Sequence, residues 1–96
     1  MSLPLQGKVV LITGGAKRVG AAIARRLHEA GAQVMLHYRG ARGEAQALAE
    51  ALNDLRADSA ATVQADLLNA GALPELVKGT VARFGSLDVL VNNASS

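Results

Sequence analysis

The sequence predicts an α/β fold in which short parallel strands form a doubly wound sheet with helices on both faces. Four short apolar runs alternate with three amphipathic helical patterns, and a glycine-containing turn follows the first run. Half of the 96 residues are apolar, whereas only 2% are aromatic, which suits α/β layers better than a β-sandwich. This alternation predicts a β-α-β-α-β-α-β order with right-handed crossovers, the N-terminal portion of a Rossmann-type sheet.

The first strand is expected at Lys8–Thr13, where an apolar, mostly β-branched run is too short to form a helix of its own. Gly14 begins the turn, and a helix is expected over Arg18–Ala30. Gly31 then stands where a helix C′ glycine belongs, and we expect His28 to be solvated or to complement the helix dipole. The apolar stripe of this helix is predicted at Val19, Ile23, Leu27 and Ala30.

The remaining elements continue the same alternation. Met35 is expected in the core of the second strand, and Pro74 in the first turn of the third helix. The predicted elements are a strand at Ala32–His37, a helix at Gly43–Ala57, a strand at Ala61–Ala65, a helix at Ala72–Phe84 and a strand at Leu87–Val91.

The expected strand order is 3-2-1-4, with the topological switch point between the first and fourth strands. A ligand should bind outside the carboxyl ends of the strands at that point. The first two helices should cover one face of the sheet and the third helix the other. The fourth strand would then form an exposed apolar edge, so we expect residues 1–96 to be the cofactor-binding portion of a longer single-domain protein.

Composition narrows the classes of function. The chain has no cysteine, which excludes a disulfide framework and a thiolate metal site, and no metal site is predicted. Its first residues do not resemble a secretory signal, and no apolar stretch approaches the roughly 20 residues that span a bilayer. The net charge is +2, but a single Phe and a single Tyr offer no stacking platform for nucleic acid. We therefore expect a cytoplasmic protein that binds a small molecule, with neither nucleic acid nor membrane as partner.

The turn after the first strand has the spacing T-G-x-x-x-R-x-G, from Thr13 through Gly14 and Arg18 to Gly20. It is not a P-loop, because two alanines follow the last glycine. A glycine turn between a strand and a helix directs backbone N–H groups and the positive end of the helix dipole at one point, which favours phosphate binding. A tight turn without a ligand is the alternative.

The second strand leads into the sequence HYRGAR at residues 37–42, with no acid before Glu44. A site for NAD would carry an acid here to bind the ribose 2′-hydroxyl, whereas arginines suit the 2′-phosphate of NADP. Arg18 and Lys17 are expected to share that phosphate, and a solvated basic loop is the alternative. Tyr38 is the only tyrosine, and we expect it to lie beside the adenosine phosphate rather than to transfer a proton.

Polar residues also follow the third and fourth strands. Asp66 is placed to accept a hydrogen bond from an adenine amino group, with the Leu67 backbone beside it; a turn or helix-capping aspartate is the alternative. Asn93 and Ala94 are expected to contact the cofactor ribose, and Ser95 to lie near the nicotinamide. An ordinary turn would also explain the paired asparagines.

Together, TGGAKRVG, ADLL and LDVLVNNA resemble the short-chain dehydrogenase/reductase family over the whole chain from about Leu5. Arg18 in place of a glycine, LHYRG and NNASS make it most similar to pteridine reductases, although Gly40 stands where some carry a phosphate-binding serine. The resemblance implies that Arg18 contacts the cofactor phosphate, and that the loop from His37 binds the 2′-phosphate. The cofactor residues predicted from the motifs and the resemblance are Gly14, Lys17, Arg18, Val19, Gly20, His37, Tyr38, Arg39, Gly40, Asp66, Leu67, Asn93, Ala94 and Ser95, with Ser95 also near the substrate.

The resemblance implies an oxidoreductase that uses NADPH to reduce dihydropteridines, or oxidised pterins and folates. The alternatives are a reductase for another carbonyl, such as a 3-oxoacyl carrier-protein thioester or a sugar ketone, and a non-catalytic NADP-binding sensor. The family's proton donor is a tyrosine four residues before a lysine, and no such pair occurs in these 96 residues, so no catalytic residue is assigned. The family also implies a homotetramer.

Overall fold

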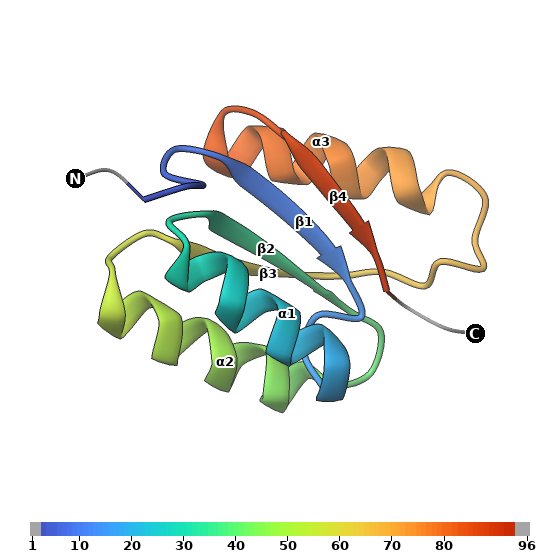
Figure 1. The fold of residues 1–96 in the computed structure, drawn as a ribbon. Helices are drawn as coiled ribbons and strands as arrows, with labels where there is room; N and C mark the ends of the chain where they lie inside the picture. The colour runs from blue at the N-terminus through green and yellow to red at the C-terminus, as the bar shows by residue number, and fades with distance from the viewer. Residues whose placement is uncertain (1–2, 94–96) are drawn as a thin grey trace.

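The computed structural model describes residues 3–93 as one four-stranded sheet flanked by three helices (Figure 1). This confirms the predicted fold class and element order, and no boundary differs from its predicted position by more than two residues. The elements are β1 (Val9–Thr13), α1 (Arg18–Glu29), β2 (Gln33–Tyr38), α2 (Arg42–Leu55), β3 (Ala60–Gln64), α3 (Ala72–Phe84) and β4 (Val89–Asn92).

The strand order is β3-β2-β1-β4, as predicted, and every neighbouring pair is parallel. At the centre of the sheet Leu11 of β1 pairs with Met35 of β2 on one side and with Leu90 of β4 on the other. The chain runs outward from β1 to β3 and then returns across the sheet to β4. The switch point therefore lies between β1 and β4, where the carboxyl ends of both strands meet.

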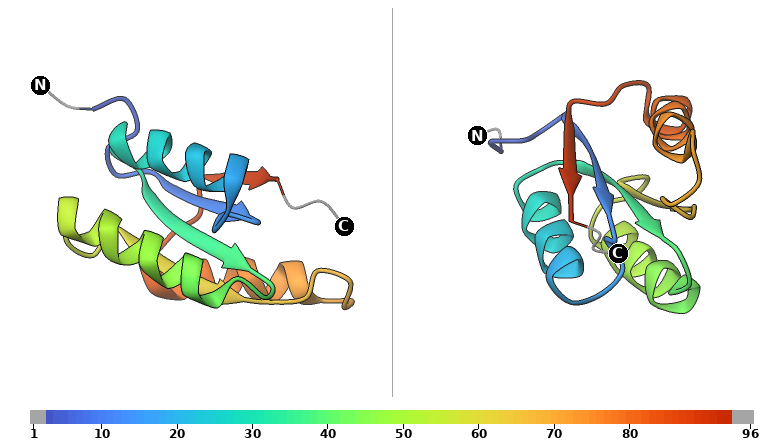
Figure 2. Two further views of the ribbon diagram at one scale, coloured as in Figure 1. Left: turned by 90° about the horizontal axis from the view of Figure 1, so that it is seen from below. Right: turned by 90° about the vertical axis from the view of Figure 1, so that its right-hand side faces the viewer.

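Helices α1 and α2 cover one face of the sheet and α3 covers the other, which the edge-on view in Figure 2 shows. Alternate residues of β1 enter the two layers, because successive side chains of a strand point to opposite faces. Met35 is buried, as predicted, at 3% exposure. The α1/α2 layer contains Val10, Ile12, Ala24, Val34, Leu36, Leu48 and Leu52, and the α3 layer contains Leu11, Met35 and Leu76.

The buried face of α1 differs from the predicted stripe. Gly20, Ala24 and His28, four residues apart, are its buried residues, whereas Val19 is 64% exposed. Small residues on the inner face let the helix approach the sheet closely, and they rotate Val19 away from the core. The expectation that His28 is solvated is also wrong, because its side chain is only 2% exposed.

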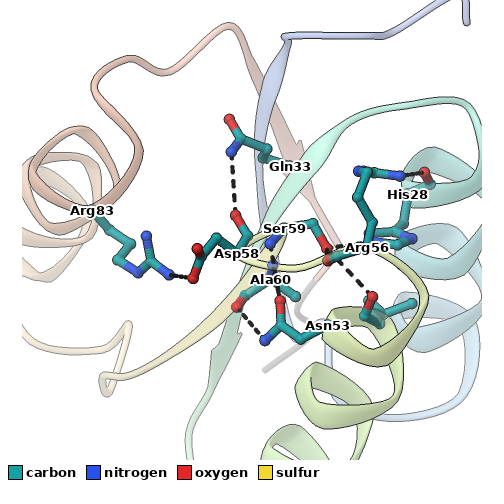
Figure 3. Close-up of polar contacts among 9 residues, drawn as sticks. His28, Gln33, Asn53, Arg56, Asp58, Ser59, Ala60 and Arg83 are labelled. Carbon is teal, nitrogen blue, oxygen red and sulfur yellow. Dashed lines mark hydrogen bonds and ion pairs between the residues drawn. The ribbon is translucent and has the colours of Figure 1, made fainter.

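His28 is buried because it has polar partners at the amino end of β3 (Figure 3). Its Nε2 lies 2.6 Å from the hydroxyl oxygen of Ser59. The guanidinium of Arg56 donates to the carbonyl oxygens of His28 and Ala32, at 3.1 and 2.6 Å. Burial lowers the pKa of His28 below its ordinary value, and the positive charge of Arg56 lowers it further. The ring is therefore held in its neutral form.

A second set of bonds in Figure 3 fixes where β3 begins. The side-chain oxygen of Asn53 accepts the backbone N–H groups of Ser59 and Ala60, both at 2.9 Å. The amide nitrogen of Asn53 donates in return to the carbonyl of Ala60 at 3.0 Å. These bonds join the last turn of α2 directly to the next strand, which keeps β3 in register with β2.

The outer edge of β4 is exposed, as predicted. Val89 and Leu90 of this strand are 41% and 42% exposed, and Leu73 and Val81 of α3 are 41% exposed. Within residues 3–93 no helix is long and apolar enough to cross a membrane.

Candidate cofactor site

A cleft of ≈ 660 Å³ lies at the carboxyl ends of the strands, at the predicted switch point. The glycine turn after β1 and the first turn of α1 form one side. The chain segments that follow β2, β3 and β4 form the rest. The residues that line it are Gly14, Lys17, Arg18, Val19, Gly20, His37, Arg39, Asp66, Leu67, Leu68, Asn92 and Asn93.

Gly20 allows α1 to begin directly over the glycine turn. A Cβ atom at this position would lie 2.0 Å from the Gly14 carbonyl oxygen and 2.7 Å from the Asn93 side-chain nitrogen, so no larger residue fits. The N–H groups of Arg18 and Val19 belong to the first helical turn and have no carbonyl partner within the helix. These N–H groups lie at the start of α1, beside the cleft, where the positive end of the helix dipole also lies. Free N–H groups at the positive end of a helix dipole are an arrangement that binds phosphate.

The glycine turn is held by hydrogen bonds to two other strands. Gly14 donates its N–H to Nδ1 of His37, and Gly15 donates to the His37 carbonyl, both at 3.0 Å. Directly after β4, the Asn93 amide nitrogen donates to the Gly14 carbonyl at 3.2 Å, and the Asn93 backbone N–H donates to the Thr13 hydroxyl oxygen at 2.9 Å. The amides of Gly14 and Gly15 are thus already bonded within the protein, so a phosphate would have to use other donors, among them the amides that open α1.

The cleft carries a net positive charge. Among residues 3–93, its lining includes the cations of Lys17, Arg18 and Arg39 and one carboxylate, that of Asp66. Arg18 adopts a left-handed backbone with φ +51°, an uncommon conformation for a residue with a side chain. Arg18 and Arg39 both line this one cleft, and their sharing of one phosphate stays a prediction.

Two of these cations have acidic neighbours. Arg39 Nη2 lies 3.6 Å from a carboxylate oxygen of Asp66, and Lys17 Nζ lies 3.5 Å from a carboxylate oxygen of Glu44. All four side chains are solvent-accessible, so these pairs contribute little stability and separate at small cost. Both cations are therefore available to a more strongly charged ligand.

The remaining predicted positions fall in different places. Tyr38 and Gly40 do not line the cleft, and their roles stay predictions. Ala94 and Ser95 lie outside the described residues. Asp66 also forms a turn, since its carboxylate accepts the N–H of Leu68 at 3.0 Å, and it lines the cleft as well.

Sequence reasoning did not assign Leu68 or Asn92, both of which line the cleft. Each stands next to a predicted residue, Leu67 or Asn93, so adjacency was the only signal in the sequence. Asn92 accepts a hydrogen bond from the Thr13 hydroxyl at 3.2 Å through its side-chain oxygen. This bond fixes the end of β4 against the end of β1.

Comparison with known proteins agrees with this geometry. Residues 8–96 match the family model described as short chain dehydrogenase. Pteridine reductase 1 from Leishmania tarentolae is 44% identical over 105 residues, which cover 92% of this chain and 36% of that protein. The 3-oxoacyl-[acyl-carrier-protein] reductase FabG from Staphylococcus aureus is 40% identical and covers 91% of this chain and 35% of its own length.

A solved structure gives the same result in three dimensions. The FolM alternative dihydrofolate reductase 1 from Brucella canis, solved in complex with NADP, superposes with a TM-score of 0.88 at 39% identity over 96% of this chain and 37% of that one. The chain thus spans just over a third of the length of these relatives. The match along the sequence and the match in fold agree, and the chain belongs to the short chain dehydrogenase family.

Proposed function

We propose that this chain is the NADP(H)-binding portion of a reductase that transfers a hydride from NADPH to a pterin or a folate. The observation that carries the proposal is the presence of Arg18 and Arg39 in one cleft. No acid stands at the end of β2, where a ribose 2′-hydroxyl would be bound. Two arginines suit a phosphate of charge near −2, through charge-assisted hydrogen bonds.

The cleft fits the parts of the cofactor. The amides that open α1, over Gly20, would bind the diphosphate, and Arg18 and Arg39 would bind the 2′-phosphate. Asp66 and the Leu67 backbone would face the adenine, and Asn93 the ribose. When bound, the nicotinamide supplies the hydride. The work of this chain is to bind the cofactor and to hold it in one orientation, so that a substrate can reach near-attack geometry.

The proton donor would come from elsewhere in a longer protein, since no tyrosine stands four residues before a lysine in this sequence. Two observations support a longer protein. The chain spans just over a third of its relatives, and Val89 and Leu90 are apolar and partly exposed on β4. Membership of the family supports a homotetramer and a cytoplasmic location.

Similarity to a pteridine reductase and to an alternative dihydrofolate reductase favours pterins or folates as substrates. A second candidate is the reduction of a 3-oxoacyl thioester, which the 40% identity to a FabG reductase favours. A sensor that binds NADP without turnover is the candidate from a different class.

The test uses the full-length protein and follows NADPH oxidation with dihydrobiopterin, dihydrofolate and acetoacetyl thioester, each against a reaction without substrate. Oxidation with a pterin or folate that is faster than with the thioester is the expected result. Faster oxidation with the thioester would show that the substrates are 3-oxoacyl thioesters rather than pterins or folates. Tight NADPH binding without oxidation in the presence of any of these substrates would support the NADP-binding sensor instead of an enzyme.

A further inference from the structure

His37 stands apart among the cleft residues because both of its ring nitrogens are bonded to backbone. The side chain is only 3% exposed. Nδ1 accepts the N–H of Gly14 at 3.0 Å, and Nε2 lies 2.8 Å from the carbonyl oxygen of Ala65. An imidazole has two nitrogens, so none remains for a phosphate oxygen.

The two partners determine the protonation of the ring. The Gly14 N–H can only donate, and the Ala65 carbonyl can only accept. With these partners the ring accepts through Nδ1 and carries its proton on Nε2. An imidazolium has a proton on both nitrogens and would leave the buried Gly14 N–H without an acceptor.

These partners belong to two different segments of the chain, the turn after β1 and the segment after β3. Gly14 lies in the turn below the amides that would bind the diphosphate. Ala65 comes directly before Asp66 and Leu67, which also line the cleft. The Ala65 N–H also donates to the carbonyl of Tyr38 at 3.1 Å, so β2 and the segment after β3 are joined by backbone as well. The rigid ring of His37 spans the distance between the turn and this segment.

We propose that His37 is a positioning residue that sets the separation between the diphosphate turn and the adenine side of the cleft. It acts through Gly14 and Ala65 and does not contact the 2′-phosphate. This inference rests on the proposed binding of NADP(H), and it assigns His37 a role different from that of a 2′-phosphate ligand, which the family resemblance implies.

Two substitutions separate the two bonds, because each amide side chain reproduces one ring nitrogen. In His37→Asn, the side-chain oxygen can take the place of Nδ1 and accept from Gly14, while the bond to Ala65 is lost. In His37→Gln, the longer side chain can place its NH₂ group near Nε2 and donate to Ala65, while the Gly14 N–H loses its acceptor. The two variants thus form a matched pair in the full-length protein.

The binding probes are NADPH and adenosine 2′-monophosphate, which has the adenine and the 2′-phosphate but no diphosphate. His37→Gln should weaken NADPH binding about tenfold and leave adenosine 2′-monophosphate within about twofold of the parent. His37→Asn should weaken both probes about tenfold, because it loosens the adenine side. Hydrogen-exchange mass spectrometry should show faster exchange across residues 14–20 in His37→Gln but not in His37→Asn.

Equal losses for both probes in both variants, with no difference in exchange, would overturn the proposal and favour direct contact with the 2′-phosphate. If His37→Gln fails to fold, the His37→Asn variant is tested by itself. Faster exchange across residues 65–68 together with weaker adenosine 2′-monophosphate binding supports the proposal, whereas weaker binding with unchanged exchange there overturns it. If the parent binds NADH as tightly as NADPH, the proposed function fails, whereas the exchange comparison still judges the role of His37.

Discussion

Arg39 and Asp66 form an ion pair at 3.6 Å between the segments that follow β2 and β3. The arginine is 67% exposed, so the pair is largely solvated and contributes little to stability. Its importance is positional. The pair places the guanidinium of Arg39 at the cleft, beside the carboxylate that would face adenine. Because the guanidinium is exposed, it can release Asp66 and bind a phosphate without a change of fold.

Arg39→Asp should weaken NADPH binding by about thirtyfold, since a charge-assisted hydrogen bond is lost and a like charge faces the 2′-phosphate. NADH lacks that phosphate and should lose about threefold or less. Titration of the full-length protein with each nucleotide measures both constants. Arg42→Asp is the matched control, because Arg42 is exposed in the first turn of α2 and does not line the cleft. Equal losses for the two nucleotides in Arg39→Asp would remove the 2′-phosphate assignment.

Two substitutions of Arg18 should distinguish the role of its side chain in NADPH binding from the effect of its backbone conformation on stability. Its φ of +51° disfavours any residue with a Cβ, so Arg18→Gly should be more stable than Arg18→Ala by about 1 kcal/mol. Both variants lack the guanidinium and should lose NADPH affinity to the same extent. Urea unfolding measures the first difference, and NADPH titration measures the second. Equal stabilities would mean that the turn relaxes around position 18.

Gly20→Ala should destabilise the protein and weaken NADPH binding together. The added methyl group would overlap the Gly14 carbonyl oxygen at 2.0 Å, so α1 must move away from the turn and its opening amides move with it. We expect a loss of about 2 kcal/mol or more in the free energy of unfolding. Gly79→Ala in α3 is the control, because nothing lies within 4 Å of its new Cβ, and it should stabilise the helix by about 0.5–1 kcal/mol. A Gly20→Ala protein as stable as its parent would contradict the close approach.

The stability of the protein should depend on the protonation of His28. Burial and Arg56 lower the pKa of His28 in the folded state below 6.5, so the unfolded chain takes up the proton more readily. The contribution of neutral His28 to the free energy of unfolding is therefore complete above pH 6.5. It decreases as the pH falls through 6.5 toward the lower folded value.

His28→Gln tests this dependence, because its amide nitrogen can still donate to the Ser59 hydroxyl oxygen while nothing titrates. Urea unfolding at about pH 5 and about pH 8 should show a larger loss of stability at low pH in the parent than in the variant. Other groups titrate equally in both proteins, so the difference between them reports on His28. The same loss in both would show that His28 is not held neutral by its surroundings.

Much of the architecture could be predicted from local patterns. Short apolar runs between amphipathic helices imply parallel strands, and Gly31, with φ +108°, ends α1 as its position suggests. The place of the cleft followed from the strand order alone. The start of β4 was placed two residues too early because its pairing is set by tertiary contacts. Asp88 precedes β4 and exchanges bonds with Val9, accepting the Val9 N–H on its carboxylate at 2.8 Å and donating its own N–H to the Val9 carbonyl at 2.9 Å.

The misplaced side chains have the same kind of cause. His28 is polar and near a helix end, which favours solvent, but the buried Ser59 hydroxyl provides its ring with a partner from 31 residues away. Val19 fits an apolar helical stripe, but the cleft lies beside the first turn of α1 and leaves it exposed. The two backbone bonds of His37 likewise join segments that no local pattern relates.

The bonds from Asn93 to Thr13 and Gly14 link positions 79 and 80 residues apart. The glycine turn therefore acquires its full set of bonds only when β4 is docked beside β1, because His37 alone bonds the amides of Gly14 and Gly15 but not the Gly14 carbonyl. Contacts between such distant positions slow folding, because closing a long loop costs entropy before the contact stabilises the chain. Formation of the nucleotide site should thus require the completed sheet.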